Sequence, residues 1–202
     1  MQALRNILHA IAWIVLIALG AMLGVASAHV AINAARGAGY ESVGPNGAWR
    51  YRAVGAETGY ARAAARANAP APLSDAEMRL FIRDTDDDGA ALREDCVYEL
   101  SGRALPTRWW SATIYHRDGA SLDNGDNAKH VRSDRLNGGP GANRSWRVRV
   151  APVRGDALHW LSSRGAGTFA IGVRAYHPLR DYREVRSALP SLQRVSCAGA
   201  KP

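Results

Sequence analysis

Hydrophobic and polar residues alternate in several short stretches of this chain. The clearest is Trp146-Arg147-Val148-Arg149-Val150, in which apolar residues take one face and arginines the other. Successive side chains of a strand point to opposite faces, so this pattern predicts a strand with one buried face. The predicted strands are residues 48–52, 79–84, 96–101, 108–116, 145–151 and 168–176. Short strands separated by Gly, Asn and Asp predict a mostly β, antiparallel sandwich or barrel.

One or two short helices are expected before the main run of strands. Residues 58–68 are rich in alanine, with arginines four positions apart, which favours a short helix. Ser74 and Glu77 have the S-x-x-E spacing of a capping box, which predicts a further helix of one or two turns. Residues 117–144 form a long polar connection. A structureless loop of that length is unusual, so we expect a hidden short strand or a functional segment there.

The N-terminal segment is apolar over a length that matches a membrane. No charged residue lies between Ala10 and Ala28, and nineteen helical residues would span about 28 Å of a hydrocarbon core about 30 Å thick. Arg5 precedes this run, which predicts a cytoplasmic N-terminus. Its length favours an uncleaved transmembrane anchor over residues 7–28. Ala26-Ser27-Ala28 is also an A-x-A cleavage site, so a signal peptide cleaved at Ala28 remains the alternative.

Both interpretations export the rest of the chain. We expect residues 1–6 in the cytoplasm, a juxtamembrane linker at 29–47 and an exported β-sandwich domain at 48–202. In a bacterium this predicts a single-pass inner-membrane protein whose C-terminal domain lies in the periplasm. The oligomeric state is left open.

The formal net charge of +8 suggests an anionic partner, but its distribution weakens that inference. Only Lys129 and Lys201 among the 26 basic residues are lysine, which resembles a coding bias more than selection for nucleic acid. Residues 73–126 carry six arginines and twelve acids, whereas residues 127–202 carry fourteen basic residues and four acids. These regions can neutralise each other within one domain. Export also removes nucleic acid as an expected partner.

Two cysteines are too few for a four-cysteine zinc site but sufficient for one disulfide. In an exported chain Cys96 and Cys197 are expected to pair, and two buried free thiols are the alternative. They are 101 positions apart, so loop entropy would stabilise the domain by at most about 4–5 kcal/mol.

Asp84-Thr-Asp86-Asp-Asp88-Gly89 resembles the first half of a calcium loop. The twelfth position of such a loop is Asp95, where the motif requires a bidentate Glu. The segment also lies between predicted strands and not between helices. A hairpin turn is therefore favoured, no metal or cofactor is assigned, and calcium binding by these three aspartates is left open.

Several longer stretches resemble one known family, catalogued as domain of unknown function 1214. They are Leu73–Glu77, Asp95–Gly102, Arg108–Tyr115, Leu158–Leu161, Phe169–Pro178 and Arg194–Cys197. The W-W-S-x-T-x-Y and R-x-Y-x-P patterns are fairly specific in combination, and the likeness is to the short, N-terminally anchored form of the family. The resemblance implies an antiparallel jelly-roll β-sandwich and no established activity. His159 stands where family members more often have Asn.

The sequence offers little support for catalysis. It contains neither the G-x-S-x-G nor the H-E-x-x-H motif, and no catalytic or ligand-binding residue is assigned. A composite site of His116, Asp118 and a nearby serine is conceivable. We therefore expect a non-enzymatic binding or interaction module of the bacterial envelope, with an envelope protein, glycan or lipid as partner. The alternative is a hydrolase or lyase with its site in a jelly-roll cleft.

Overall fold

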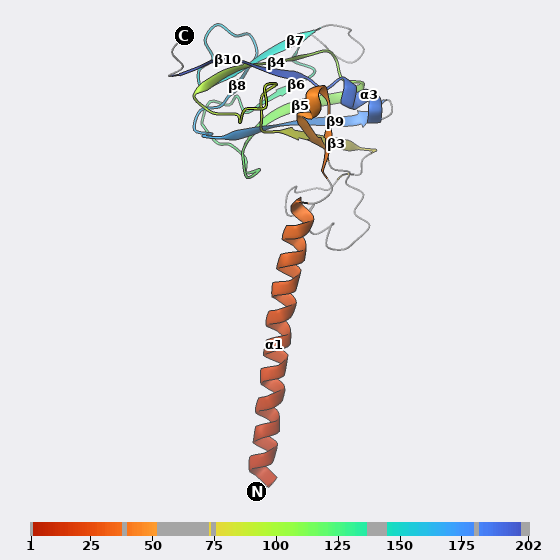
Figure 1. Cartoon of the computed structure of the whole chain (residues 1–202), viewed down its shortest axis with the longest axis vertical. Coiled ribbons are helices and arrows are strands. Elements are labelled where there is room, and N and C mark those ends of the chain that lie inside the picture. Colours follow the sequence, from red (N-terminus) through yellow and green to blue (C-terminus); the bar gives the residue numbers. More distant parts are fainter. Residues whose placement is uncertain are drawn as a thin grey trace. The chain divides into compact units, whose positions relative to one another are not determined.

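The computed structural model describes residues 2–37, 40–51, 73, 76–136, 145–179 and 182–198. The chain divides into two compact units, one containing the long N-terminal helix and the other containing all the strands (Figure 1). The expected helix at residues 58–68 lies outside the described residues.

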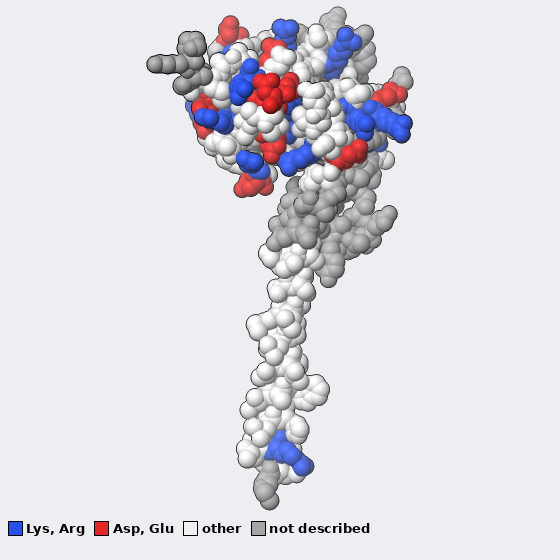
Figure 2. All heavy atoms as spheres, viewed as in Figure 1, with Lys and Arg blue, Asp and Glu red and all other residues white. Residues whose placement is uncertain are grey.

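The N-terminal unit contains α1, a single helix of 36 residues from Gln2 to Gly37. Its Gln2–Ala31 portion is long and apolar enough to cross a membrane, a criterion that an anchor and a signal sequence both satisfy. Figure 2 shows almost no charge along it except near its N-terminal end. The helix continues past Ala28 because the following residues are mostly Ala, Val and Ile without Gly or Pro before Gly37. The expected linker at 29–47 therefore begins as helix.

The second unit is a sandwich-like pair of β-sheets. The larger sheet has six strands, and every neighbouring pair in it is antiparallel. Its order is β1 (Glu41–Val43), β2 (Trp49–Tyr51), β3 (Met78–Arg83), β9 (Phe169–Pro178), β5 (Thr107–His116) and β6 (His130–Arg132). The first strand and the short 3-10 turn η1 (Pro45–Gly47) both fall within the expected linker.

The smaller sheet has four strands and is mixed. Its order is β10 (Ser191–Cys197), β4 (Cys96–Gly102), β7 (Trp146–Ala151) and β8 (Trp160–Ser162). β7 and β8 run parallel, whereas the other two pairs are antiparallel. The expectation of a mostly β sandwich is confirmed. The purely antiparallel arrangement expected of it does not hold for this sheet.

The core lies between the inner faces of the two sheets. Trp110 of β5 and Trp146 of β7 stack with ring centroids 4.7 Å apart, and both are buried. The Trp146 indole N–H donates to the carbonyl oxygen of Arg103 at 2.8 Å, so burial leaves that donor satisfied. Trp109, the neighbour of Trp110, lies on the outer face, where its ring contacts Tyr176. The opposite orientation of the two tryptophans is the one that strand alternation predicts.

The expected helix after Ser74 is wrong in the part that the structure describes. Glu77 lies in a turn, and Met78 already begins β3. Residues Met78–Arg83 pair along their whole length with β9, and these ladder hydrogen bonds and the burial of Phe81 outweigh a local capping signal. The expected hidden strand within 117–144 is confirmed as β6. Sequence patterns missed the short helix α3 (Tyr182–Ser187) and the strands β1, β8 and β10.

Candidate functional site

The aspartate-rich segment forms a tight hairpin turn. Asp86 is 1% exposed, and its Oδ1 accepts the main-chain N–H groups of Asp88 and Ala90 at 3.1 and 2.8 Å. Gly89 has φ +83°, the left-handed conformation that glycine adopts at low cost. An isolated bridge between Thr85 and Ala91 closes the hairpin. The turn interpretation thus accounts for the position of Asp86 and Gly89 without a metal.

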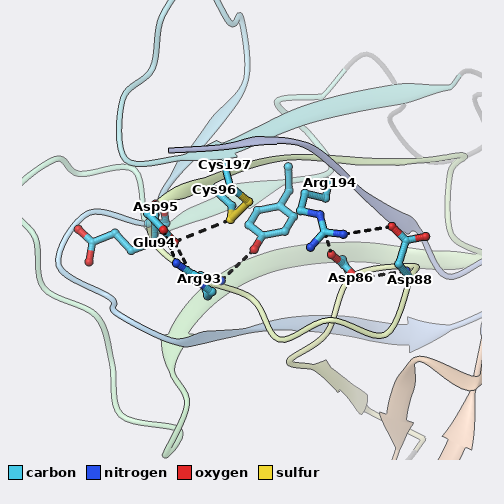
Figure 3. The surroundings of a disulfide bond; sticks show 10 residues. Asp86, Asp88, Arg93, Glu94, Asp95, Cys96, Arg194 and Cys197 are labelled. Atoms are coloured by element: carbon cyan, nitrogen blue, oxygen red, sulfur yellow. Dashed lines mark hydrogen bonds and ion pairs between the residues drawn. A yellow bond between two sulfur atoms is a disulfide. The ribbon is translucent and has the colours of Figure 1, made fainter. Parts of the chain in front are cut away.

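Each of the three aspartates that resemble calcium-loop ligands, Asp84, Asp86 and Asp88, lies close to an arginine. Asp84 pairs with Arg50 at 3.1 Å, whereas Asp86 and Asp88 both face Arg194 of β10, at 3.6 and 3.5 Å (Figure 3). Within the described residues, no group of three or more His, Cys, Asp or Glu side chains is placed to hold a metal ion. Asp86 and Asp88 thus attach the turn to β10, and Asp84 attaches the start of the segment to β2.

A buried arginine joins the same turn to both sheets. Arg83 of β3 is 0% exposed, and its guanidinium lies 5.3 Å from the Trp49 ring centroid. It donates to the carbonyl oxygen of Thr85 at 2.7 Å and to Asp87 at 3.0 Å. Asp87 in turn accepts the main-chain N–H of Leu192 in β10. Burial lowers the pKa of the Arg83 guanidinium, and Asp87 opposes that shift. This network stabilises the fold, and we assign it no ligand.

The expected disulfide between Cys96 and Cys197 is present. It joins β4 to the edge strand β10 at the last position of their register (Figure 3). Next to it, the Tyr98 hydroxyl accepts the main-chain N–H of Arg93 at 2.9 Å, and burial raises the pKa of Tyr98. The covalent bond therefore fixes the end of an edge strand that has only one hydrogen-bonded neighbour.

The conceivable site of His116 and Asp118 is not assembled in the described structure. His116 ends β5, and Asp118 lies in the tight turn that follows, where its carboxylate accepts the main-chain N–H of Ala120 at 3.0 Å. The main-chain N–H of His116 donates to the carbonyl oxygen of Ala120 in the same turn. Asp118 therefore caps a turn rather than orienting an imidazole.

The outer face of the smaller sheet carries a groove that sequence analysis did not assign. We call it the outer groove, and it has a volume of about 430 Å³. The side chains that matter for its chemistry are Val97, Glu99, Arg147, Arg149, Leu158, His159 and Val195. In β4 and β7 these residues alternate with the buried ones, Tyr98, Leu100, Val148 and Val150. Alternation thus turns the polar face of the sheet into the floor of the groove.

One wall of the outer groove comes from an irregularity in β10. The register of β10 against β4 shifts between Arg194 and Ser196, so Val195 has no partner in the ladder. A bulge re-aims the side chain at that position, and Val195 is 64% exposed. Leu158, before β8, is 73% exposed and also lines the groove. Two exposed apolar side chains therefore flank a polar floor.

Two nitrogens of the outer groove are buried and lack any hydrogen-bond partner in the described structure. They are Nε of Arg149 and Nε2 of His159. The main-chain N–H of Arg149 donates to the carbonyl oxygen of His159 at 3.0 Å, which holds the two residues side by side. Arg147 differs from them, because its Nε lies 3.5 Å from a Glu99 carboxylate oxygen. Atoms this buried leave no room for a ligand oxygen, and Arg83 Nη2 in the buried network is in the same state, so these two atoms do not by themselves mark a ligand site. What distinguishes Arg149 is that its guanidinium lines the groove and has no ion-pair partner among the described residues.

A second hollow of about 310 Å³ also includes His159. Its other lining residues are His130, Val131, Arg132, Arg135 and Leu136, from β6 and the turn after it. Arg132 donates to Asp134 at 2.7 Å, and Asp134 also accepts the indole N–H of Trp109 at 3.1 Å. The Trp109 hydrogen bond lowers the pKa of Asp134, with Arg132 adding to the effect. His159 thus lies where two hollows with several cationic side chains meet.

The sequence pattern predicted part of this site. Alternation in β7 placed Arg147 and Arg149 on the outer face, and that prediction is confirmed by the burial of Val148 and Val150. Nothing in the sequence indicated that His159 would lie beside Arg149. That contact depends on the parallel pairing of β7 with β8, which a local pattern does not encode.

These features define a class of protein. A two-sheet β domain with a disulfide, in a chain with a long apolar N-terminal helix, is typical of secreted or envelope proteins. The model of the family described as "Protein of unknown function (DUF1214)" matches residues 77–180, more than half of the chain. The chain belongs to the DUF1214 family.

The solved structures similar to this chain include two bacterial proteins. The VPA0106 protein from Vibrio parahaemolyticus has a TM-score of 0.52 and 18% identity, over 61% of this chain and 32% of its own. An uncharacterized protein from Burkholderia cenocepacia has a TM-score of 0.45 and 18% identity, over 58% of this chain and 29% of its own. The matched region thus spans about a third of the length of these proteins. A search of curated proteins found no significant match. At this identity the first likeness supports the fold alone.

Proposed function

We propose that this chain is a membrane-tethered, non-enzymatic binding module of the bacterial envelope, with the outer groove as its ligand-binding surface. On this proposal α1 remains uncleaved as a single-pass anchor in the inner membrane, and the sandwich lies in the periplasm. The length and composition of Gln2–Ala31 support the anchor, and the disulfide between Cys96 and Cys197 supports an oxidising compartment.

The observation that carries the choice of surface is the guanidinium of Arg149, which lines the outer groove and has no ion-pair partner among the described residues. A cation in a partly enclosed groove is stabilised by an opposite charge with matching hydrogen-bond geometry, and an anionic ligand can supply that charge. The exposed Leu158 and Val195 supply apolar contact area beside this cation.

Photo-crosslinking in living cells tests this proposal. The full chain would carry a photoreactive amino acid either at Leu158 in the outer groove or at Leu179, which is 60% exposed but does not line the groove. We expect an adduct with an envelope component from position 158 and none from position 179. Replacing Arg149 with Met in the 158 variant should reduce the adduct strongly.

Equal crosslinking at both positions, or none at position 158, would exclude the outer groove as the binding surface. A hydrolase or lyase makes a different prediction, since its ligand would be converted. Mass analysis of a bound ligand before and after incubation with the full chain should therefore show no change in the ligand. Steady appearance of a product would show that the protein is an enzyme and not a binding module.

A further inference from the structure

Two arginines around His159 have no ion-pair partner within the described residues. Arg147 is paired with Glu99 and Arg132 with Asp134. Arg149, in the outer groove, and Arg135, in the second hollow, have no such carboxylate. His159 lies between them, because it lines both hollows. Each hollow thus offers one uncompensated guanidinium.

The donors at the shared boundary suit a particular chemical group. A guanidinium nitrogen is always a donor, and an imidazole nitrogen donates when it carries the proton. The planar fork of the Arg149 guanidinium, which has no carboxylate partner among the described residues, matches the two oxygens of a carboxylate. A second carboxylate on the same ligand would meet Arg135 in the adjoining hollow.

The surroundings favour a sugar over a membrane surface. Leu158 and Val195 border the outer groove with exposed apolar groups, against which the C–H faces of a sugar ring can pack. Attraction to an anionic bilayer surface typically takes a cluster of about four to eight Lys or Arg on one face. Here the cations line concave hollows, and Figure 2 shows acidic and basic side chains interspersed on the visible face of the domain.

We propose that the two hollows bind one acidic oligosaccharide, with one carboxylate on Arg149, beside His159, and the next on Arg135. This inference rests on the proposed function and specifies its ligand class. Arg147 contributes less to binding, because Glu99 already neutralises its charge. Arg149 and Arg135 line different hollows, so a ligand that meets both needs two carboxylates, and a single acidic sugar would occupy only half of the site.

Calorimetric titration of the full chain in phosphatidylcholine nanodiscs tests the inference, with trigalacturonate as the probe. Neutral galactotriose is the matched control sugar, and glucuronate is the single acidic sugar. We expect saturable binding of trigalacturonate and at least tenfold weaker binding of both other sugars. Arg149→Met should weaken binding about ten- to hundred-fold, since a hydrogen bond to a charged group is lost. Arg135→Met should also weaken it at least several-fold.

Two further variants keep the test informative if Arg149→Met is poorly folded. Arg149→Lys retains the charge but removes the planar fork of the guanidinium, so it should still bind less tightly than the wild type. Arg108→Met removes an exposed arginine of the other sheet and should leave binding unchanged. Circular dichroism melting of each variant separates lost binding from lost folding.

Equal binding of trigalacturonate and galactotriose would overturn the inference, as would unchanged binding in both Arg149→Met and Arg135→Met. Binding to phosphatidylglycerol vesicles but not to trigalacturonate would show that the ligand is an anionic lipid and not a glycan. If the groove crosslinks in cells while trigalacturonate does not bind, the ligand class is wrong and the proposed function survives. If position 158 gives no adduct and trigalacturonate does not bind, both the ligand class and the proposed function are wrong.

Discussion

The main-chain N–H of Arg149 donates to the carbonyl oxygen of His159, and this 3.0 Å bond joins two residues whose side chains line the same groove. Arg149 belongs to β7 and His159 immediately precedes β8, and these strands form the parallel pair of the smaller sheet. Parallel pairing therefore places a histidine beside an arginine ten positions away. The ligand site that we propose depends on this relationship.

Removing the disulfide should destabilise the sandwich without abolishing the fold. Replacing both Cys96 and Cys197 with Ser removes a constraint across 101 positions, and we expect a loss of about 2–5 kcal/mol in the free energy of unfolding. Urea unfolding of the full chain in nanodiscs, followed by tryptophan fluorescence, measures it. Adding a reductant should shift the wild type toward the variant and leave the variant unchanged. A wild type that is insensitive to complete reduction would contradict this role.

The buried ion pair of Arg83 and Asp87 should matter far more than the exposed pair of Arg50 and Asp84. Replacing Asp87 with Asn leaves the Arg83 guanidinium buried without its charge partner, and we expect a loss of about 3 kcal/mol or more. Asp84→Asn breaks a pair at a similar distance, but Arg50 is exposed, so the loss should be below about 1 kcal/mol. Urea unfolding of both variants compares them. Similar losses for the two would show that Asp87 does not stabilise a buried charge.

Asp86 should act through its turn and not through calcium. Asp86→Ala removes the acceptor of two main-chain N–H groups, so we expect a loss of about 1–3 kcal/mol. The melting temperatures of wild type and variant should be the same in millimolar calcium and in EDTA. Asp88→Ala is the matched control, because Asp88 is largely exposed and only approaches Arg194. Calcium-dependent stabilisation of the wild type that Asp86→Ala removes would reinstate the metal site.

The pH dependence of Asp134 should reveal its bond to Trp109. The indole N–H stabilises the charged carboxylate, so the pKa of Asp134 lies below its ordinary value. A depressed pKa means that the stabilising interaction is present above the ordinary pKa and is lost as the pH falls through the lowered one. Carboxyl carbon NMR should therefore show a higher Asp134 pKa in Trp109→Phe than in the wild type.

Tyr176→Leu provides the control for that titration, because it removes the ring that contacts Trp109 but keeps the indole donor. Its Asp134 pKa should stay close to that of the wild type. An equal rise in both variants would mean that packing around Trp109, and not the hydrogen bond, lowers the pKa.

Local patterns identified most of the strands but few of the contacts between them. Alternation in Trp146–Ala151 and the opposite orientations of Trp109 and Trp110 follow from the geometry of a single strand. The capping signal at Glu77 predicts a helix that does not form, because pairing of β3 with β9 decides the conformation there. β10 was missed because its exposed edge position gives a weak pattern, with only Leu192 fully buried.

The sequence by itself determined the apolar N-terminal helix and the mostly β character of the domain, and it predicted the cysteine pairing expected on export. Each of these depends on length, composition or local periodicity. Only the tertiary structure decided that Arg149 and Arg135 line two hollows that share His159, because these side chains come from β7, the turn after β6 and the segment before β8. This arrangement depends on long-range strand pairing, which no single stretch of the chain encodes.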